Sequence, residues 1–186
     1  MSKHREILPE VIKRLAAVDP GCGVVVIGSV QYGYERPDSD LDLLAVVHEA
    51  AANGLSDWKV AWESRGVREL ETEIKKILVQ VFFAPVSGLE RWLTETPYFM
   101  YPFSQGELLH DPQGLAAHYQ LSARKYFEER PAVASEWSAQ LQAHKQVKLT
   151  GRDKEGFYRT ETGELKKYLS LGEFCSRIAE VAAASF

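Results

Sequence analysis

The chain has 186 residues, which is the size of one ordinary domain or of one domain with a helical appendage. Hydrophobic residues make up 45% of the sequence and charged residues 26%, a composition typical of a folded globular protein and not of a disordered one. Lys and Arg together number 22 against 26 Asp and Glu, so the formal net charge is −4. This acidic balance gives no support to binding of nucleic acid or of an anionic membrane over the whole surface.

Cysteine and histidine exclude two common kinds of site. Cys22 and Cys175 lie far apart and form no CxxC, which excludes a disulfide framework and a cysteine-type zinc site and fits a reducing compartment. The five histidines show no HExxH or other ligand spacing. No apolar run approaches the roughly 18 residues of a membrane span, and the N-terminus lacks a secretory hydrophobic region. We therefore expect a cytoplasmic protein without a membrane segment.

Helix and strand signals alternate at the start of the chain. Apolar residues over 7–15 recur at helical spacing and predict a helix. The β-branched run 24–27 predicts a buried strand, which ends at a Gly-Ser pair. The segment 30–39 is expected to be a short helix or a loop, and 41–47 is expected to be a second apolar strand.

The segment 48–76 is open to two interpretations. A hairpin around 58–71 is one of them; the other is a helix, suggested by the spacing of Val67, Leu70, Ile74 and Ile77. After it, 77–83 predicts a third strong strand, 89–93 a short helix and 106–110 a short edge strand.

The last third of the chain is predicted to be helical. A helix over 115–129 ends before Pro131. One further apolar stripe at helical spacing runs from Val133 to His144, and another runs from Leu165 to Ala182. The connection 150–163 between them carries three glycines and many charges, which indicates a mobile loop.

The elements together indicate an α/β (α+β) fold. We expect a small mixed β-sheet with flanking helices, followed by a helical C-terminal part. The expected division is an α/β core over 1–115 and a helical region over 116–186.

The chemically informative segment joins a Gly-Ser pair to two aspartates. Gly28 and Ser29 follow a buried strand, and Asp40 and Asp42 come after ten intervening residues. Side chains two apart in a strand point to one face, so the two carboxylates project together and can share a hard cation such as Mg²⁺. Glycine lets a ligand approach the backbone, and the Ser29 hydroxyl can donate to phosphate oxygens. A phosphate cradle facing a metal-binding carboxylate pair is what phosphoryl or nucleotidyl transfer needs.

The segments Ile27-Gly28-Ser29 and Asp40-Leu41-Asp42-Leu43 together resemble the motif of the nucleotidyltransferase superfamily. This is the polymerase-beta-like fold of the minimal and aminoglycoside nucleotidyltransferases, and the resemblance spans roughly 6–129. It implies that Asp40 and Asp42 are catalytic and hold Mg²⁺. It also implies a nucleotide-binding role for Gly28 and Ser29, with Gly33 and Ser39 as further matches that are common in minimal members.

The sequence departs from the family pattern at Gln80. Active members carry a third carboxylate on the next core strand, and Gln80 stands at the position that aligns with it. An amide can neither accept a proton nor supply negative charge. Three explanations stay open: Glu73 or another acid takes the role from a shifted register, two carboxylates suffice with water as base, or the protein binds nucleotide without efficient turnover.

The resemblance implies a transferase that moves a nucleoside monophosphate, AMP from ATP or another nucleoside triphosphate, to an acceptor hydroxyl and releases pyrophosphate. The acceptor could be a small molecule, a protein or RNA. The alternative is a catalytically weak binding or regulatory module, such as an antitoxin-type partner or a nucleotide sensor. A homodimer and a complex with a helical partner protein are both open.

Overall fold

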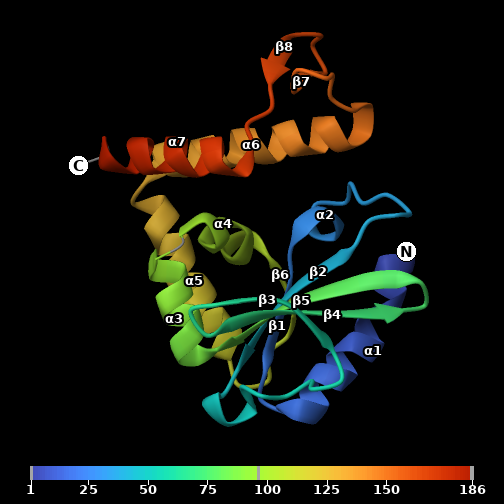
Figure 1. Ribbon diagram of the computed structural model, residues 1–186. Coiled ribbons are helices and arrows are strands. Elements are labelled where there is room, and N and C mark those ends of the chain that lie inside the picture. The colour runs from blue at the N-terminus through green and yellow to red at the C-terminus, as the bar shows by residue number, and fades with distance from the viewer. Residues whose placement is uncertain (1, 96, 185–186) are drawn as a thin grey trace. The chain divides into compact units, whose positions relative to one another are not determined.

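The computed structural model describes residues 2–95 and 97–184 (Figure 1). The chain divides into two compact units, 1–123 and 124–186, and the division lies within helix α5 (Leu115–Glu128). None of the helices in the described residues combines the length and the apolar character that crossing a membrane requires.

The first unit contains one β-sheet and the helices that cover it. Its elements before α5 are, in chain order, α1 (Lys3–Val18), β1 (Gly23–Val26), α2 (Gly28–Gln31), β2 (Leu41–Val47), the 3-10 helix η1 (Glu49–Ala51), β3 (Lys59–Ser64), β4 (Val67–Ile74), β5 (Ile77–Pro85), α3 (Val86–Glu95), α4 (Pro97–Gln105) and β6 (Glu107–His110).

The sheet is mixed and has the strand order β3-β4-β5-β2-β1-β6. Strands β2 and β5 are parallel, and the other neighbouring pairs are antiparallel. The register aligns Asp42 with Gln80 across β2 and β5, and Gln80 with Glu71 across β5 and β4. Directly paired residues face the same side of a sheet, so these three side chains form one row across three strands.

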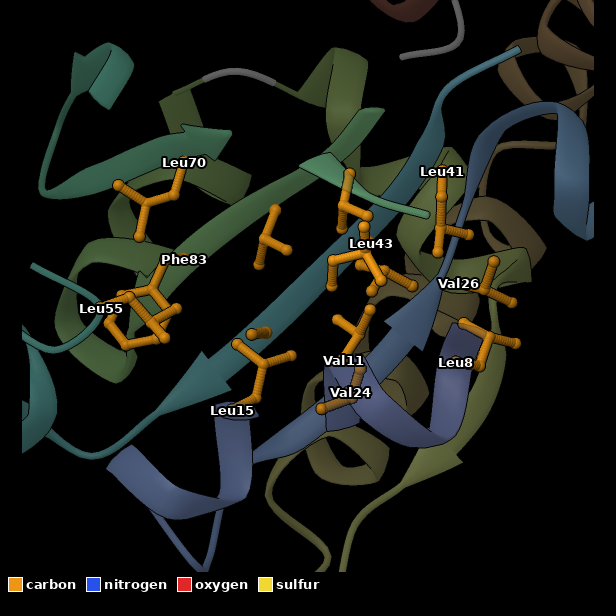
Figure 2. Close-up of a cluster of buried hydrophobic side chains, with 14 of the residues drawn as sticks. Leu8, Val11, Leu15, Val24, Val26, Leu41, Leu43, Leu55, Leu70 and Phe83 are labelled. Carbon is orange, nitrogen blue, oxygen red and sulfur yellow. The ribbon is translucent and has the colours of Figure 1, made fainter. Parts of the chain in front are cut away.

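Two apolar clusters cover the two faces of the sheet. On one face, Leu8, Val11 and Leu15 of α1 pack against Val24 and Leu43 of the central strands (Figure 2). The cluster on the other face includes residues of α3, α4 and α5, and its members are Val25, Ile27, Leu44, Val46, Val67, Ala84, Leu89, Trp92, Leu93, Phe103, Ala116 and Ala123. Because side chains alternate along β2, Asp42 lies on the second face, at the end of the sheet where β2 begins.

The segment 48–76, for which the sequence allows either a helix or a hairpin, contains a hairpin. Strands β3 and β4 pair antiparallel through a turn at Arg65 and Gly66, both of which have positive φ, at 55° and 83°. A second two-residue turn at Lys75 and Lys76, with φ of 51° and 65°, leads from β4 into β5. Consecutive positive φ values are the geometry of tight hairpin turns, so a helix through this segment is excluded.

The second unit is helical with a small hairpin. Helices α6 (Pro131–Thr150) and α7 (Leu171–Ala183) pack together, and Trp137 meets Phe174 edge to face at 4.7 Å between ring centroids. Strands β7 (Phe157–Arg159) and β8 (Leu165–Lys167) pair in the connection between the two helices.

The predicted α/β fold with a mixed sheet is confirmed, and one local prediction in the last third is wrong. The connection 150–163, predicted as a mobile loop, contains strand β7, which pairs with β8 just beyond it. The second apolar stripe was expected to be helical from Leu165, but α7 begins only at Leu171. The reason is a capping box, in which Ser170 and Glu173 bond each other's backbone N–H groups and start the helix there.

Candidate active site

Gly28 brings the backbone after β1 directly against the side chain of Asp42. It has φ of +69°, and a Cβ added to it would lie 2.2 Å from Oδ2 of Asp42. The backbone N–H of Ile27 donates to the carbonyl oxygen of Asp42 at 3.0 Å and fixes this approach. The close contact and the left-handed conformation together explain why glycine stands here.

Ser29 contributes a buried hydroxyl to the same turn. The residue is only 2% exposed, and its Oγ has no hydrogen-bond partner among the described residues. Its carbonyl oxygen accepts from the backbone N–H of Tyr34 at 3.2 Å, which closes the turn after α2. A buried hydroxyl without a partner is unfavourable, and such groups need an explanation such as a ligand that is absent from the structure.

Ser39 holds the turn that precedes the two aspartates. Its Oγ accepts from the backbone N–H of Arg36 at 2.8 Å, and its own N–H donates to the Arg36 carbonyl at 3.0 Å. The carbonyl oxygen of Ser39 lies 2.8 Å from Nε2 of the buried His4 on α1. These contacts tie the chain to α1 immediately before Asp40, so Ser39 is placed to orient the acids.

Gly33 lies in the loop between these two turns. It has φ of +68°, and a Cβ added to it would meet nothing within 4 Å in the described residues. This conformation explains the need for glycine at this position.

Asp40 and Asp42 stand at the start of β2 and are both half-buried. Leu41 and Leu43, which alternate with them, are fully buried in the core on the opposite face. The period of two along the strand therefore directs the two aspartates to the face that also bears Gln80.

Gln80 makes its hydrogen bonds to two carboxylates of the neighbouring strand. Its Nε2 donates to Oε1 of Glu69 at 2.9 Å and to Oε1 of Glu71 at 3.0 Å. The amide of Gln80, which pairs with Asp42 on one side, is thus bonded on the other side to two glutamates of β4. Glu73, the acid that the sequence offered as a replacement, pairs with the exposed Leu78 at the outer end of the hairpin.

The two glutamates have different electrostatic surroundings. Burial raises the pKa of Glu69, and the negative charges of Glu71 and Asp40 raise it further. Hydrogen bonds from Gln80 and from Lys59, whose Nζ lies 3.1 Å from Glu71, lower the pKa of Glu71. Sequence reasoning missed both residues, although their alternation with Leu70 is a strand signal once 67–74 is recognised as β4.

The aspartate pair fits a magnesium ion that is also bound by substrate. Within the described residues, no group of three or more His, Cys, Asp and Glu is placed to hold a metal ion. Magnesium does not require such a group, since it is usually held by one or two carboxylates together with substrate phosphates. The oxygen donors of Asp40 and Asp42 are compatible with that arrangement, and so is the Ser29 hydroxyl, which has no partner among the described residues.

We expect Gly28→Ala to disable the site. The new Cβ would collide with the Asp42 carboxylate and force it to move, and alanine at this positive φ adds a cost of about 1–2 kcal/mol. Magnesium-dependent ATP binding, measured by calorimetry, should be lost. Gly114→Ala is the matched control because Gly114 has a similar φ of +71° with nothing within 4 Å of an added Cβ in the described residues. If both variants bind ATP equally, the contact between Gly28 and Asp42 has no functional weight.

Similar solved structures include a nucleotidyltransferase-like protein, a poly(U) polymerase and a terminal uridylyl transferase. A nucleotidyltransferase-like protein from Exiguobacterium sibiricum is 11% identical, with 81% of this chain and 50% of that chain covered and a TM-score of 0.44. Cid1 poly(U) polymerase is 17% identical, with 54% and 36% covered and a TM-score of 0.35. Terminal uridylyl transferase 4 from Trypanosoma brucei with bound CTP is 16% identical, with 80% and 46% covered and a TM-score of 0.36.

The matched region is half or less of each of these three structures. No family model matches the sequence, and no curated protein matches it. The similarities in sequence and backbone are low, so the chemistry of this chain is inferred from its own residues.

Proposed function

We propose that the protein transfers a nucleoside monophosphate, AMP from ATP, to a hydroxyl group of an acceptor and releases pyrophosphate. The observation that carries this proposal is the meeting of the Gly28 backbone with the Asp42 carboxylate. Two further observations support it: the Ser29 hydroxyl of the same turn is buried without a hydrogen-bond partner among the described residues, and Asp42 begins the strand on the face that bears Gln80.

Each residue has a role that follows from its position. The Gly28 backbone lets the Asp42 carboxylate lie close to the turn, and the Ser29 hydroxyl donates to a phosphate oxygen of the substrate. Asp40 and Asp42 would hold Mg²⁺ together with the phosphates, and Ser39 orients the turn that presents the two aspartates. When bound, Mg²⁺ neutralises the charge that develops on the phosphates during transfer.

The test measures binding and turnover separately on the whole chain. Calorimetry with ATP, with and without Mg²⁺, should show metal-dependent binding. A pyrophosphate assay should then show release with water as acceptor, and faster release with a correct acceptor among small hydroxyl compounds, protein substrates and RNA. Absence of both metal-dependent binding and pyrophosphate release would refute the proposal.

The second candidate function is a nucleotide-binding module without efficient turnover. Gln80 favours it, because the nucleotidyltransferase pattern that the sequence resembles has an acid at this position, and an amide cannot accept a proton. Such a module binds ATP with Mg²⁺, releases no pyrophosphate with any acceptor, and associates stably with a helical partner protein. The same two assays therefore separate the two functions.

A further inference from the structure

Gln80 is hydrogen-bonded to two carboxylates other than those of Asp40 and Asp42. The amide nitrogen of Gln80 donates to Glu69 and to Glu71 at 2.9 and 3.0 Å. Gln80 itself pairs with Asp42 in the parallel ladder. Through its one side chain, Gln80 on β5 therefore connects the position beside Asp42 to two acids on β4.

The two glutamates differ in how their negative charge is balanced. Glu71 forms an ion pair with Lys59 at 3.1 Å. Glu69 forms no ion pair with any described residue, although it is half-buried and lies near the charges of Glu71 and Asp40. Holding a half-buried carboxylate beside two other acids without a cation is unfavourable to folding, so a functional reason for Glu69 is needed.

We propose that Glu69 is the third carboxylate of the site, moved from β5 to β4, and that Gln80 is the positioning residue that holds it. This proposal rests on the nucleotidyl transfer proposed above. The acceptor hydroxyl oxygen forms a bond to the α-phosphorus while Glu69 takes the hydroxyl proton. The bond from the α-phosphorus to the bridging oxygen of the β-phosphate breaks, and pyrophosphate leaves with the electron pair.

The chemistry of the two strands supports this division of roles. An amide cannot take a proton, but its two N–H groups can fix two carboxylates at once. A carboxylate without a cation keeps its full capacity as a base, whereas one paired with lysine is a weaker base. Glu69 is therefore better suited than Glu71 to accept the proton.

Glu69→Gln is the discriminating variant, and Glu71→Gln is its matched control. Both substitutions keep an oxygen that accepts from Gln80, and each removes one charge from the same face of β4. In pyrophosphate release from ATP and Mg²⁺ with water as acceptor, Glu69→Gln should lower kcat about a hundredfold, the lower end of general-base effects, with KM for ATP within twofold. Glu71→Gln should stay within threefold of wild type. The melting temperature of nucleotide-free Glu69→Gln should be unchanged or raised, because a repulsive charge is removed.

The opposite results overturn the proposal in recognisable ways. A merely structural Glu69 predicts a lower melting temperature in Glu69→Gln, with no separation of kcat from KM. Glu69→Gln activity near that of wild type, or a larger loss in Glu71→Gln, also refutes the role of Glu69 while leaving the transferase function standing. If the wild-type protein releases no pyrophosphate, the proposed function fails, and the role of Glu69 fails with it.

Discussion

Asp42→Asn is expected to abolish magnesium-dependent transfer while leaving the fold intact. The substitution keeps the shape of the side chain and leaves the backbone bond from Ile27 to the Asp42 carbonyl in place. It removes one of the two carboxylates that we propose to hold the metal, so we expect pyrophosphate release to fall by about a thousandfold, the scale seen when a charge-stabilising group is removed. Calorimetry should show that ATP no longer binds in a magnesium-dependent way.

Asp38→Asn is the control for this substitution. Asp38 lies two residues before Asp40, and its exposed carboxylate pairs with Arg36 at 2.7 Å. Exposed ion pairs contribute little to stability, so this variant should retain both activity and stability. The free energy of unfolding of Asp42→Asn, measured by denaturant, should also lie within about 0.5 kcal/mol of the wild-type value. If Asp42→Asn keeps a tenth or more of the wild-type rate, the metal-binding role of this aspartate is wrong.

The elements that could be predicted from sequence are those whose apolar residues follow a single pattern, either that of a buried strand or that of a helix. The continuous apolar runs of β1, β2 and β5 are too short for buried helices and therefore indicate strands. The apolar residues of α1 and α5 recur at regular helical spacing. The motif residues are also close together in sequence. Strands β1 and β2 pair antiparallel, and this pairing brings the Gly-Ser turn next to the start of β2.

The β3–β4 hairpin and its glutamates could not be predicted with the same certainty. Val67, Leu70 and Ile74 are all buried, yet Val67 belongs to the cluster on one face of the sheet and the other two belong to the cluster on the opposite face. Residues buried on both faces of a strand imitate helical spacing, which hid the alternation of Glu69 and Glu71. Their approach to Gln80 depends on the register of β4 against β5, which two consecutive lysines with positive φ establish.

The substitution Gln80→Glu is expected to lower the stability of the folded protein. Gln80→Glu replaces two donated hydrogen bonds with a third negative charge beside Glu69 and Glu71. A hydrogen bond to a charged group contributes about 1.5–3 kcal/mol, and we expect the free energy of unfolding at pH 7 to fall by about 2–3 kcal/mol. Urea denaturation measures this difference.

The pH dependence of Gln80→Glu identifies the cause of that loss. Burial and neighbouring acids already raise the pKa of Glu69 in the folded protein, and the introduced carboxylate should raise the pKa values of the group further. Carboxylates whose pKa is raised by folding stabilise the protein when protonated, and this stabilisation is lost as the pH rises through the folded pKa. The difference from wild type should therefore shrink between pH 7 and about pH 4, near the ordinary pKa of glutamate.

Gln80→Met separates the lost hydrogen bonds from the added charge. Methionine removes the donors without adding a charge, so its effect on stability should change less with pH than that of Gln80→Glu. If Gln80 is the positioning residue, both variants should also release pyrophosphate more slowly than wild type, because Glu69 is no longer held. A Gln80→Glu protein that is as stable as wild type and faster would mean that position 80 only lacks the family's acid, and that Glu69 does not replace it.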